Sequence, residues 1–484
     1  MNSNPASSEA TPRLARIIPR DSHPISRSRI SPDALRVLYR LREAGFQAYL
    51  VGGCVRDLML GLEPKDFDVA TDALPEQVKK LFRNCRLVGR RFRLAHVFFG
   101  REIIEVATFR ASSAPSQAED PVASLESSDE VAEEPVVEGD IHDFDENLER
   151  VVDDSGRILR DNVYGSIDDD VWRRDFTCNS LYYNIADFSV WDYCGGFEDV
   201  EARRLRLIGD PETRYREDPV RMLRAARFEA KLGFEIEAAT AEPMAALADL
   251  LAGVPAARLF DETLKLFLTG HGARSLETLQ NRGLLKVLLP NVGDFMERYP
   301  QSPPAQMLRQ ALANTDARVQ ADKPVTPGFL FAVLLYGPIG LEIEKAPREQ
   351  WHDIGTILDA VDRAVTVIHR RVAVHRRFIL GVRDMFALQP RLESPRGRRA
   401  LRTMEHPRFR AAFDLLQLRS QFGMADAAIV EWWSRMQSAS AEQRAAMAES
   451  LGRASGAGAV RSGASRARGG RRRGRGGRGR RSGE

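Results

Sequence analysis

Two features are scarce in this sequence: cysteine and long apolar runs. The four cysteines (Cys54, Cys85, Cys178 and Cys194) are far apart and form no C-x-x-C pair, which argues against a disulfide framework or a Cys-rich zinc site. No apolar run reaches the roughly 18 residues that a membrane helix needs, and the longest, 329–335, is predicted to be a buried core segment. We therefore expect a cytoplasmic protein with no membrane partner.

Lysine is absent from the last part of the chain, 453–484, where eleven arginines and one acid give a net charge of +10. The residues before it carry a net charge of −7. Glycine and arginine dominate this C-terminal tail and no apolar period runs through it, so we expect disorder. Because arginine pairs with phosphates and stacks on bases, we expect the tail to contact RNA. A solubilising tail without a specific target is the alternative.

Shifts in composition divide the rest of the chain. Residues 1–29, rich in Ser, Pro and Arg, predict an unstructured arm. Short apolar strands and helices alternate over 30–208, which predicts an α+β domain with a mixed sheet. They include a capped amphipathic helix that starts at Ser31 and paired strands at 93–99 and 103–108. Within it, 112–149 holds thirteen acids and no Lys or Arg, which is typical of an acidic disordered insertion. Helical periodicity fills 209–452, so an all-α remainder is expected.

Two adjacent glycines, Gly52 and Gly53, lie between a predicted strand at 48–51 and a predicted helix at 55–60. Glycines let backbone N–H groups approach an anion, and the N-terminus of a helix adds a favourable partial charge. Arg56, in the first turn of that helix, adds a fork of donors. These three residues predict a triphosphate cradle, although Gly-Gly alone is more often a plain turn.

A D-x-D pattern, Asp66 and Asp68, lies at the start of a predicted strand at 67–70. Residues two apart on a strand point to the same face, so the two carboxylates would repel each other. Mg²⁺ relieves such repulsion and prefers carboxylate oxygens together with substrate phosphates. The pattern therefore predicts a two-metal site, with a solvated strand edge as the plainer alternative.

Such a site needs a third carboxylate, and two residues qualify. Glu105 interrupts the apolar run 103–108, where the alternative is a surface strand position. Asp175 follows Arg173 and Arg174, where the alternative is an ion pair with these arginines. We favour Asp175, because adjacent arginines such as Arg174 suit nucleotide phosphates, and we retain Glu105 as a further candidate metal ligand.

The last candidate pattern opens a helix. Asp218 stands before Pro219, which suits the first helical position, and Arg221 and Arg224 lie three residues apart on one helical face. Carboxylate acceptors and a planar guanidinium fork together suit the edge of a nucleotide base. An N-cap followed by a solvated arginine face is the plainer interpretation.

Taken in order, four segments resemble the successive motifs of the class II nucleotidyltransferases, the family of bacterial poly(A) polymerases and tRNA CCA-adding enzymes: 50–57, 66–68, 173–180 and 217–224. Segments 81–96 and 209–224, together with the C-terminal tail, are similar to the poly(A) polymerase branch. The insertion at 112–149 departs from that pattern, because a shorter loop is expected there.

The resemblance implies a polymerase-β-type nucleotidyltransferase head (30–208), a helical neck with base recognition (209–270) and a helical, RNA-binding body (271–452). It implies Mg²⁺-dependent, template-independent transfer of AMP from ATP to RNA 3′ ends, promoting RNA turnover, with RNA-decay proteins as further partners. A CCA-adding enzyme and a non-catalytic RNA-binding scaffold are the alternatives. The residues that carry over are catalytic Asp66, Asp68 and Asp175, triphosphate-binding Gly52, Gly53 and Arg56, and base-reading Asp218, Arg221 and Arg224.

Overall fold

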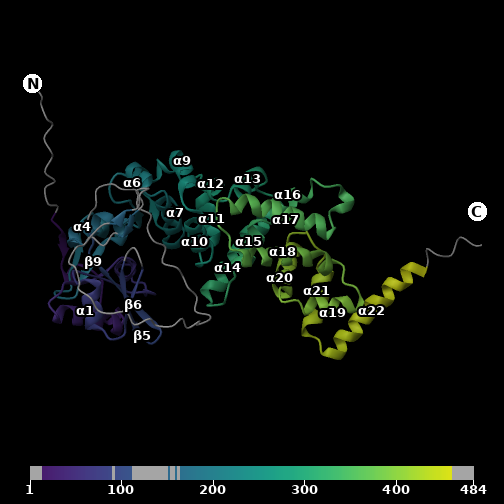
Figure 1. The fold of residues 1–484 in the computed structure, drawn as a ribbon, viewed down its shortest axis with the longest axis horizontal. Helices are drawn as coiled ribbons and strands as arrows, with labels where there is room; N and C mark the ends of the chain where they lie inside the picture. Colours follow the sequence, from purple (N-terminus) through teal and green to yellow (C-terminus); the bar gives the residue numbers. More distant parts are fainter. Residues whose placement is uncertain (1–13, 90–92, 112–150, 153–157, 161–163, 461–484) are drawn as a thin grey trace, which may run out of the picture. The chain divides into compact units, whose positions relative to one another are not determined.

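The structure, a computed structural model, describes residues 14–89, 93–111, 151–152, 158–160 and 164–460 (Figure 1). The chain divides into two compact units. Unit 1 is the described part of Met1–Tyr299 with Leu312–Pro327 and Thr366–His375, and unit 2 is Pro300–Ala311, Gly328–Val365 and the described part of Arg376–Glu484. The predicted acidic insertion (112–149) and residues 461–484 of the predicted tail lie outside the described residues.

Unit 1 contains an eight-stranded sheet with the strand order β1-β10-β9-β2-β3-β6-β5-β4. Strands β3 and β6 pair in parallel and the other neighbours are antiparallel, which confirms the predicted mixed sheet. Its strands are β1 (Arg16–Ile18), β2 (Ala48–Val51), β3 (Asp68–Thr71), β4 (Cys85–Val88), β5 (Leu94–Phe99), β6 (Glu102–Thr108), β9 (Leu181–Asn184) and β10 (Val190–Asp192).

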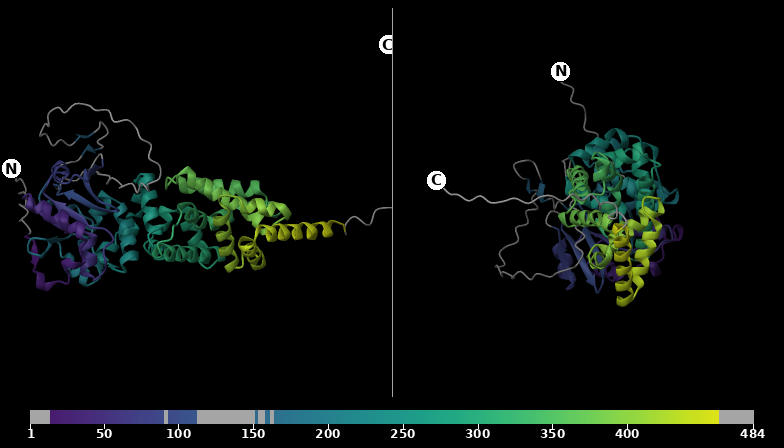
Figure 2. Two further views of the ribbon diagram at one scale, coloured as in Figure 1. Left: turned by 90° about the horizontal axis from the view of Figure 1, so that it is seen from below. Right: turned by 90° about the vertical axis from the view of Figure 1, so that its right-hand side faces the viewer.

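One face of this sheet is covered by α1 (Pro32–Glu43), which packs against β2, β3 and β6 (Figure 2). The hydroxyl of Ser31 caps the helix by accepting from the N–H groups of Asp33 and Ala34. Its apolar residues recur at helical spacing, so Val37, Leu38 and Leu41 are all buried. The predicted helix start at Ser31 is therefore confirmed.

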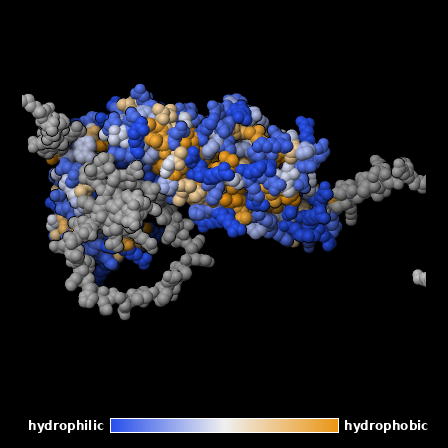
Figure 3. All heavy atoms as spheres, turned by 45° about the horizontal axis from the view of Figure 1, so that its top comes forward, coloured by the Kyte–Doolittle hydropathy of each residue, from blue (hydrophilic) through white to orange (hydrophobic). Residues whose placement is uncertain are grey.

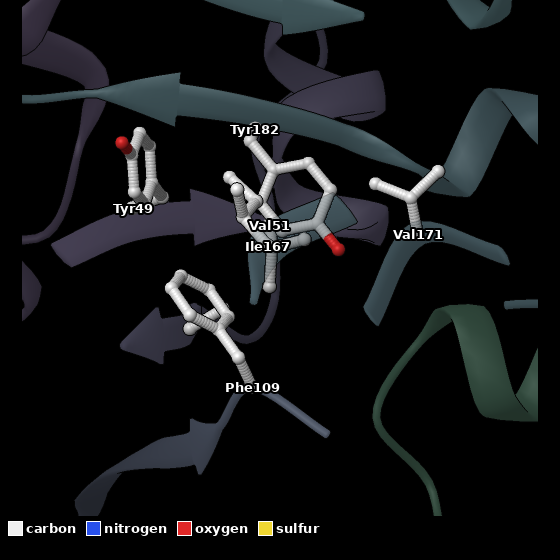
Figure 4. Packing of buried hydrophobic residues seen from close by; sticks show 7 residues of the cluster. Tyr49, Val51, Phe109, Ile167, Val171 and Tyr182 are labelled. Atoms are coloured by element: carbon white, nitrogen blue, oxygen red, sulfur yellow. The ribbon is translucent and has the colours of Figure 1, made fainter. Parts of the chain in front are cut away.

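The opposite face is closed by α4 (Ile167–Arg173). Alternation along β2 directs Tyr49 and Val51 to this face, where they join Tyr182 of β9 and Ile167 and Val171 of α4 in one buried cluster (Figure 4). This cluster fixes the last turn of α4 against the ends of β2 and β9. The residues that follow α4 are thereby held over the edge at which β3 begins.

The N-terminal segment is not an unstructured arm throughout. Residues Arg16–Ile18 form β1, which pairs antiparallel with β10 at the edge of the sheet. His23 and Ile25 are buried behind it. The prediction for 14–29 is therefore wrong, because pairing with a strand more than 170 residues away stabilises a segment that has no periodicity of its own.

Helices predominate in the described part of the chain after residue 209. Besides α1 and α4, the helices wholly within unit 1 are α2 (Gly53–Met59), α3 (Pro75–Leu81), α5 (Gly196–Glu201), α6 (Pro211–Glu217), α7 (Val220–Leu232), α8 (Ala238–Ala241), α9 (Met244–Leu247), α10 (Ala256–Phe267), α11 (Gly272–Asn281), α12 (Leu285–Leu288) and α13 (Pro290–Arg298). Helices α14 (Pro303–Gln320) and α17 (Ile354–His369) contribute to both units. Short strand pairs, β7 (Val151–Val152) with β8 (Ile158–Arg160) and β11 (Arg204–Leu205) with β12 (Glu235–Ile236), complete the architecture.

Unit 2 is entirely helical among its described residues. It contains α15 (Pro327–Leu334), α16 (Tyr336–Ile343), α18 (Arg376–Glu393), α19 (Gly397–Met404), α20 (Phe409–Gln421), α21 (Ala427–Ser438) and α22 (Ala441–Val460). Six of the eight residues of α15 are buried, as predicted for the apolar run at 329–335. Helix α22 continues to Val460, so the predicted boundary at 452 lies inside a helix.

No described helix has the length and hydropathy of a membrane span. On the face drawn in Figure 3, hydrophilic residues cover most of the described surface and hydrophobic residues form smaller patches between them.

Candidate active site

Two acidic residues lie side by side on the face of the sheet that α4 covers. Asp68, the first residue of β3, pairs in register with Glu105 of β6, and with Val51 of β2 on its other side. Register partners point to the same face of a sheet, so the two carboxylates are neighbours. The same row continues to His96 of β5, whose Nε2 lies 3.6 Å from the Glu105 carboxylate.

The electrostatics confirm that these acids share one environment. Burial and the charge of Glu105 together raise the pKa of Asp68 to about 7, against the opposing effect of Arg174. Burial also raises the pKa of Glu105, and Asp66 acts on it in the same direction. Asp66 itself is exposed and precedes β3. The charges of Glu105 and Asp66 therefore both oppose ionisation of Asp68, which is half-buried.

Gly52 links this acidic group to the start of α2. Its φ of +78° and ψ of −138° suit only glycine. A Cβ at this position would lie 3.8 Å from Nη1 of Arg174 and 3.8 Å from Oδ2 of Asp68. The predicted Gly-Gly turn, a cation and a carboxylate thus meet at one point, where the N-terminus of α2 begins with Gly53.

Arg174 is held in place from two sides. Its Nε donates to the Tyr182 hydroxyl at 2.9 Å and its Nη2 donates to Oδ2 of Asp170 at 2.9 Å. Burial opposes ionisation of Asp170, but Arg174 and Tyr182 keep its pKa below the ordinary value. Asp170 and Tyr182 therefore orient the guanidinium group, while Nη1 stays near Gly52.

Arg56 is turned away from solvent, with only 2% of its surface exposed. Its Nε and Nη2 donate to Oδ1 of Asp57 at 2.9 and 2.6 Å, and its Nη1 donates to the Oδ1 of Asn179. The guanidinium thus ties α2 to the segment 173–180. Arg56 therefore lies beside the glycine turn, as expected, but its guanidinium donors are bonded to Asp57 and Asn179 of the protein itself.

Asp175 does not join Asp68 and Glu105. Its Oδ1 accepts from Nε of Arg221 at 3.0 Å and its Oδ2 accepts from Nη1 of Arg224 at 2.5 Å. Although burial would raise its pKa, Arg224 and Arg221 hold the pKa below the ordinary value.

Both predicted partner sets for Asp175 therefore differ from what the structure shows. Its two bonds go neither to the candidate metal-binding acids nor to its neighbours Arg173 and Arg174, but to two arginines more than 45 residues further on. Glu105, not Asp175, occupies the position beside Asp68, because the parallel register of β3 and β6 brings it there.

The start of α7 has features of both interpretations of its sequence, the helix cap and the set of side chains that could read a base. Asp218 is buried, and its Oδ1 accepts from the Val220 N–H, as expected of a cap. Its Oδ2 accepts from Nη2 of Arg258 at 2.7 Å, so α10 is tied to this helix start. Arg221 is only 8% exposed and also donates to Glu217 at 3.1 Å. The arginine face is therefore packed, not solvated.

These groups adjoin one another along α7. Arg227 lies one turn beyond Arg224, and burial together with the charges of Arg224 and Arg56 lowers its pKa, against Glu262 and Asp175. Charges shift a pKa in this way only when they are close together. Arg227 therefore connects the arginines around Asp175 with Arg56 of α2.

Five partners in this network were not predicted from the sequence: Asp170, Asn179, Tyr182, Glu217 and Arg258. Asn179 stands within the segment 173–180, and Glu217 directly precedes Asp218, so the motif spacing contained a signal for these two. No sequence signal pointed to Arg258, because its partner Asp218 lies 40 residues earlier in the chain.

Among the described residues, no group of three or more His, Cys, Asp or Glu side chains is arranged to hold a metal ion by itself. Mg²⁺ is commonly bound by one or two carboxylates plus substrate phosphates, not by an all-protein cage. Burial and, after it, repulsion by Glu105 raise the pKa of Asp68, and a bound cation would relieve the repulsion. Asp66, Asp68 and Glu105 therefore fit such an ion by their chemistry.

Comparison with protein families places this geometry in context. The chain matches the "Poly A polymerase head domain" at residues 48–206, the "Probable RNA and SrmB- binding site of polymerase A" at 233–296 and the "Polymerase A arginine-rich C-terminus" at 349–476.

Individual relatives show the same pattern. The chain is 46% identical to poly(A) polymerase I of Escherichia coli O6:H1 over 441 residues, 89% of this chain and 88% of that one. It is 34% identical to a CCA-adding enzyme of Bacillus pumilus over 255 residues, 53% of this chain and 54% of that one. Among solved structures, a tRNA-processing enzyme in an apo form shares the fold, with a TM-score of 0.54 at 19% identity over 86% of this chain and 99% of that one.

Proposed function

Because the chain belongs to the poly(A) polymerase family, we propose that it adds AMP from ATP to RNA 3′ ends without a template. The observation that carries this proposal is the juxtaposition of Gly52, Arg174 and Asp68 at the start of α2. A backbone turn that admits phosphate oxygens, a fixed cation and a half-buried acid with a raised pKa are what nucleotidyl transfer requires at one point.

The carboxylates would hold the metal. Asp66, Asp68 and Glu105 would bind Mg²⁺ together with nucleotide phosphate oxygens. When bound, the metal would lower the pKa of the RNA 3′-hydroxyl and neutralise charge on the departing pyrophosphate. Asp68 contributes most to this site, because it is the best buried of the three and because its repulsion by Glu105 disappears once a cation is present.

The triphosphate would lie on Gly52, Gly53 and Arg174. The N–H groups at the start of α2 face an anion favourably. Arg174 is oriented by Asp170 and Tyr182, so little side-chain entropy is lost when it contacts phosphate. Arg56 would support this cradle from behind, as a buried brace between α2 and Asn179.

Base selection would rest on α7. Asp218 and Arg221 would read the adenine edge, with Arg224 assisting. In this proposal Asp175 is a positioning residue, because its two carboxylate oxygens hold Arg221 and Arg224 in a fixed geometry. A protein pocket of this kind selects the base without a template strand.

The remaining partners follow from the same family. RNA and ATP are the proposed substrates, and RNA-decay proteins are proposed partners. We also propose the cytoplasm as the location, which is supported by four cysteines that are all free and by the lack of a membrane-spanning helix among the described residues.

Primer extension tests the proposal. The full chain is given Mg²⁺ with ATP or CTP, on an oligo(A) primer and on a tRNA without its 3′ CCA. Long ladders with ATP on oligo(A) are expected. Short CTP-dependent additions confined to the tRNA would identify the protein as a CCA-adding enzyme. No incorporation on either RNA would favour the alternative of a non-catalytic RNA-binding scaffold.

The acidic site is tested by Asp68→Ala, which should abolish incorporation while the chain stays folded. The matched control is Glu102→Ala, which removes an acid from β6 on the opposite face of the sheet, three residues from Glu105. Appreciable incorporation by folded Asp68→Ala would refute the assigned role.

A further inference from the structure

An imidazole stands at the border of the acidic site, and the proposed function gives it no role. Strands β5 and β6 pair antiparallel, so His96 of β5 lies directly opposite Glu105 of β6. Glu105 is in turn the register partner of Asp68 in β3. Because register partners point to the same face of a sheet, the imidazole nitrogen of His96 lies on the face that carries the carboxylates.

The separation of His96 and Glu105 suits a shared cation better than a hydrogen bond. Nε2 of His96 lies 3.6 Å from Oε2 of Glu105, which is beyond the usual N–H···O range of about 2.7–3.2 Å. Zn²⁺ binds imidazole nitrogen and carboxylate oxygen at about 2.0–2.2 Å, and two such ligands on a tetrahedral ion are roughly 3.4 Å apart. The two atoms therefore stand close to the spacing of a chelating pair.

Both side chains are accessible, and the ring of His96 is held by its neighbours. Exposed fractions are 26% for the His96 side chain and 41% for that of Glu105. The His96 ring meets the ring of Phe98 edge-on, with centroids 6.3 Å apart. Arg86, the register partner of His96 in β4, places its guanidinium over the same Phe98 ring, 5.7 Å from the centroid. An ion can therefore reach an imidazole whose position packing has already restricted.

The charges around Glu105 leave room for a cation. Burial raises the pKa of this carboxyl, Asp66 adds to the effect, and the opposing charge of Arg110 does not reverse it. Asp68, its register partner, is a further acid on the same face. The cations of the protein therefore do not fully compensate this group of carboxylates, and a bound ion would add the missing positive charge.

The pair of donors favours one class of ion. Mg²⁺ prefers oxygen ligands in octahedral geometry, whereas imidazole suits zinc and the later first-row metals. Among the described residues no third His, Cys, Asp or Glu completes a cage. Such an ion would therefore have two protein ligands, with water or a substrate phosphate in its remaining positions, which makes the site open and its affinity modest.

We propose that Glu105 and His96 chelate a borderline divalent cation of the Zn²⁺ class, and that this ion opposes nucleotidyl transfer. Chelation draws the Glu105 carboxylate toward His96 and away from a magnesium ion beside Asp68. The inhibition rests on the proposed function, in which Glu105 binds Mg²⁺. The binding of Zn²⁺ does not depend on it.

Binding is tested with the full chain freed of Mg²⁺, by calorimetric titration with Zn²⁺ and by visible absorption with Co²⁺ as the probe. Loss of an outer-shell partner of a metal ligand typically costs about 10–100-fold in metal affinity, so loss of a direct ligand in His96→Gln should cost at least that much. Glu105→Gln, which keeps the size of the side chain, is the second variant and should weaken Zn²⁺ binding similarly.

The matched control is His369→Gln, which removes an exposed imidazole at the end of α17. Its affinity for Zn²⁺ should equal that of the unmodified chain. Unchanged Zn²⁺ affinity in His96→Gln, or an equal loss in His369→Gln, would overturn the site. Intense thiolate bands in the Co²⁺ spectrum would also overturn it, because they would assign the ion to a cysteine such as the half-buried Cys194.

Inhibition is measured separately, by primer extension at a fixed Mg²⁺ concentration. Zn²⁺ should inhibit the unmodified chain, and added Mg²⁺ should relieve the inhibition. Relative to its own rate without Zn²⁺, His96→Gln should need at least about tenfold more Zn²⁺ for half-inhibition, in line with its loss of affinity. Equal inhibition of both proteins would overturn the inhibitory role. If the unmodified chain extends no primer with Mg²⁺ alone, the proposed function fails, while the calorimetric comparison still decides whether the Zn²⁺ site exists.

Discussion

The half-buried carboxyl of Asp68, at the start of β3, makes a quantitative prediction about stability. The pKa of Asp68 is raised from 3.8 to about 7, and one pKa unit corresponds to about 1.4 kcal/mol. Ionising this carboxyl above about pH 7 therefore costs the folded chain up to about 4 kcal/mol. Replacing Asp68 by Asn removes this cost and keeps the shape of the side chain.

The sign follows from proton binding. Between about pH 4 and about pH 7 the folded state holds a proton that the unfolded state has lost, so stability falls as pH rises through this window. Asp68→Asn has no such fall. Its stability advantage over the unmodified chain should be smallest near pH 4, grow toward pH 7 and then level off.

Urea unfolding in EDTA, followed across this pH range, measures the difference. Asp66→Asn is the control, because it removes an exposed acid two residues before Asp68. Asp66 is the smallest of the contributions to the raised pKa of Asp68, so this variant should change the pH dependence much less. Added Mg²⁺ should narrow the advantage of Asp68→Asn, since the cation compensates the charge in the unmodified chain. Stability curves of Asp68→Asn and the unmodified chain that run parallel from pH 4 to 8 would refute the reasoning.

Three further outcomes are expected. Asp175→Ala leaves Arg221 and Arg224 without their shared carboxylate and should lower the free energy of unfolding by about 3 kcal/mol, the low end for a broken buried pair; a loss under about 1 kcal/mol in urea would contradict this. Arg258→Ala frees the buried carboxylate of Asp218 and should reduce discrimination between ATP and CTP about tenfold, or about 1.4 kcal/mol, in single-nucleotide incorporation; unaltered discrimination would remove Arg258 from base selection. Deleting 461–484 removes ten arginines and should weaken RNA binding and flatten its salt dependence; an unchanged affinity would favour the solubilising alternative.

Local patterns predicted the parts of the fold that depend on local interactions. Ser31 before an amphipathic run gave the start of α1, and the apolar runs around 48–51 and 94–108 gave β2, β5 and β6 within a few residues. Strand β1 was missed because its three residues gain order only by pairing with β10. Such a partner is not visible in the residues themselves.

The candidate site shows the same limit. The motifs identified Gly52, Asp68 and Arg174, which the structure brings together. They did not reveal which acid stands beside Asp68, because the answer depends on the register of two parallel strands joined by a long crossover. The partners of Asp175 were equally out of reach, since an ion pair across 46 residues leaves no local pattern.

The division of the chain between its two units has a consequence for synthesis. The chain passes from one unit to the other five times, and unit 1 receives its last segment, Thr366–His375, only after both of unit 2's first two segments have been made. Asp316, in the first segment that returns to unit 1 (Leu312–Pro327), accepts from the N–H groups of Gly272 and Ala273 at the start of α11. A nascent chain that has reached residue 299 therefore lacks part of the support of its own neck helices. Unit 1 cannot finish folding on the ribosome before residue 375 has emerged, so a stalled or cleaved product shorter than this should be recognised by proteases as incomplete.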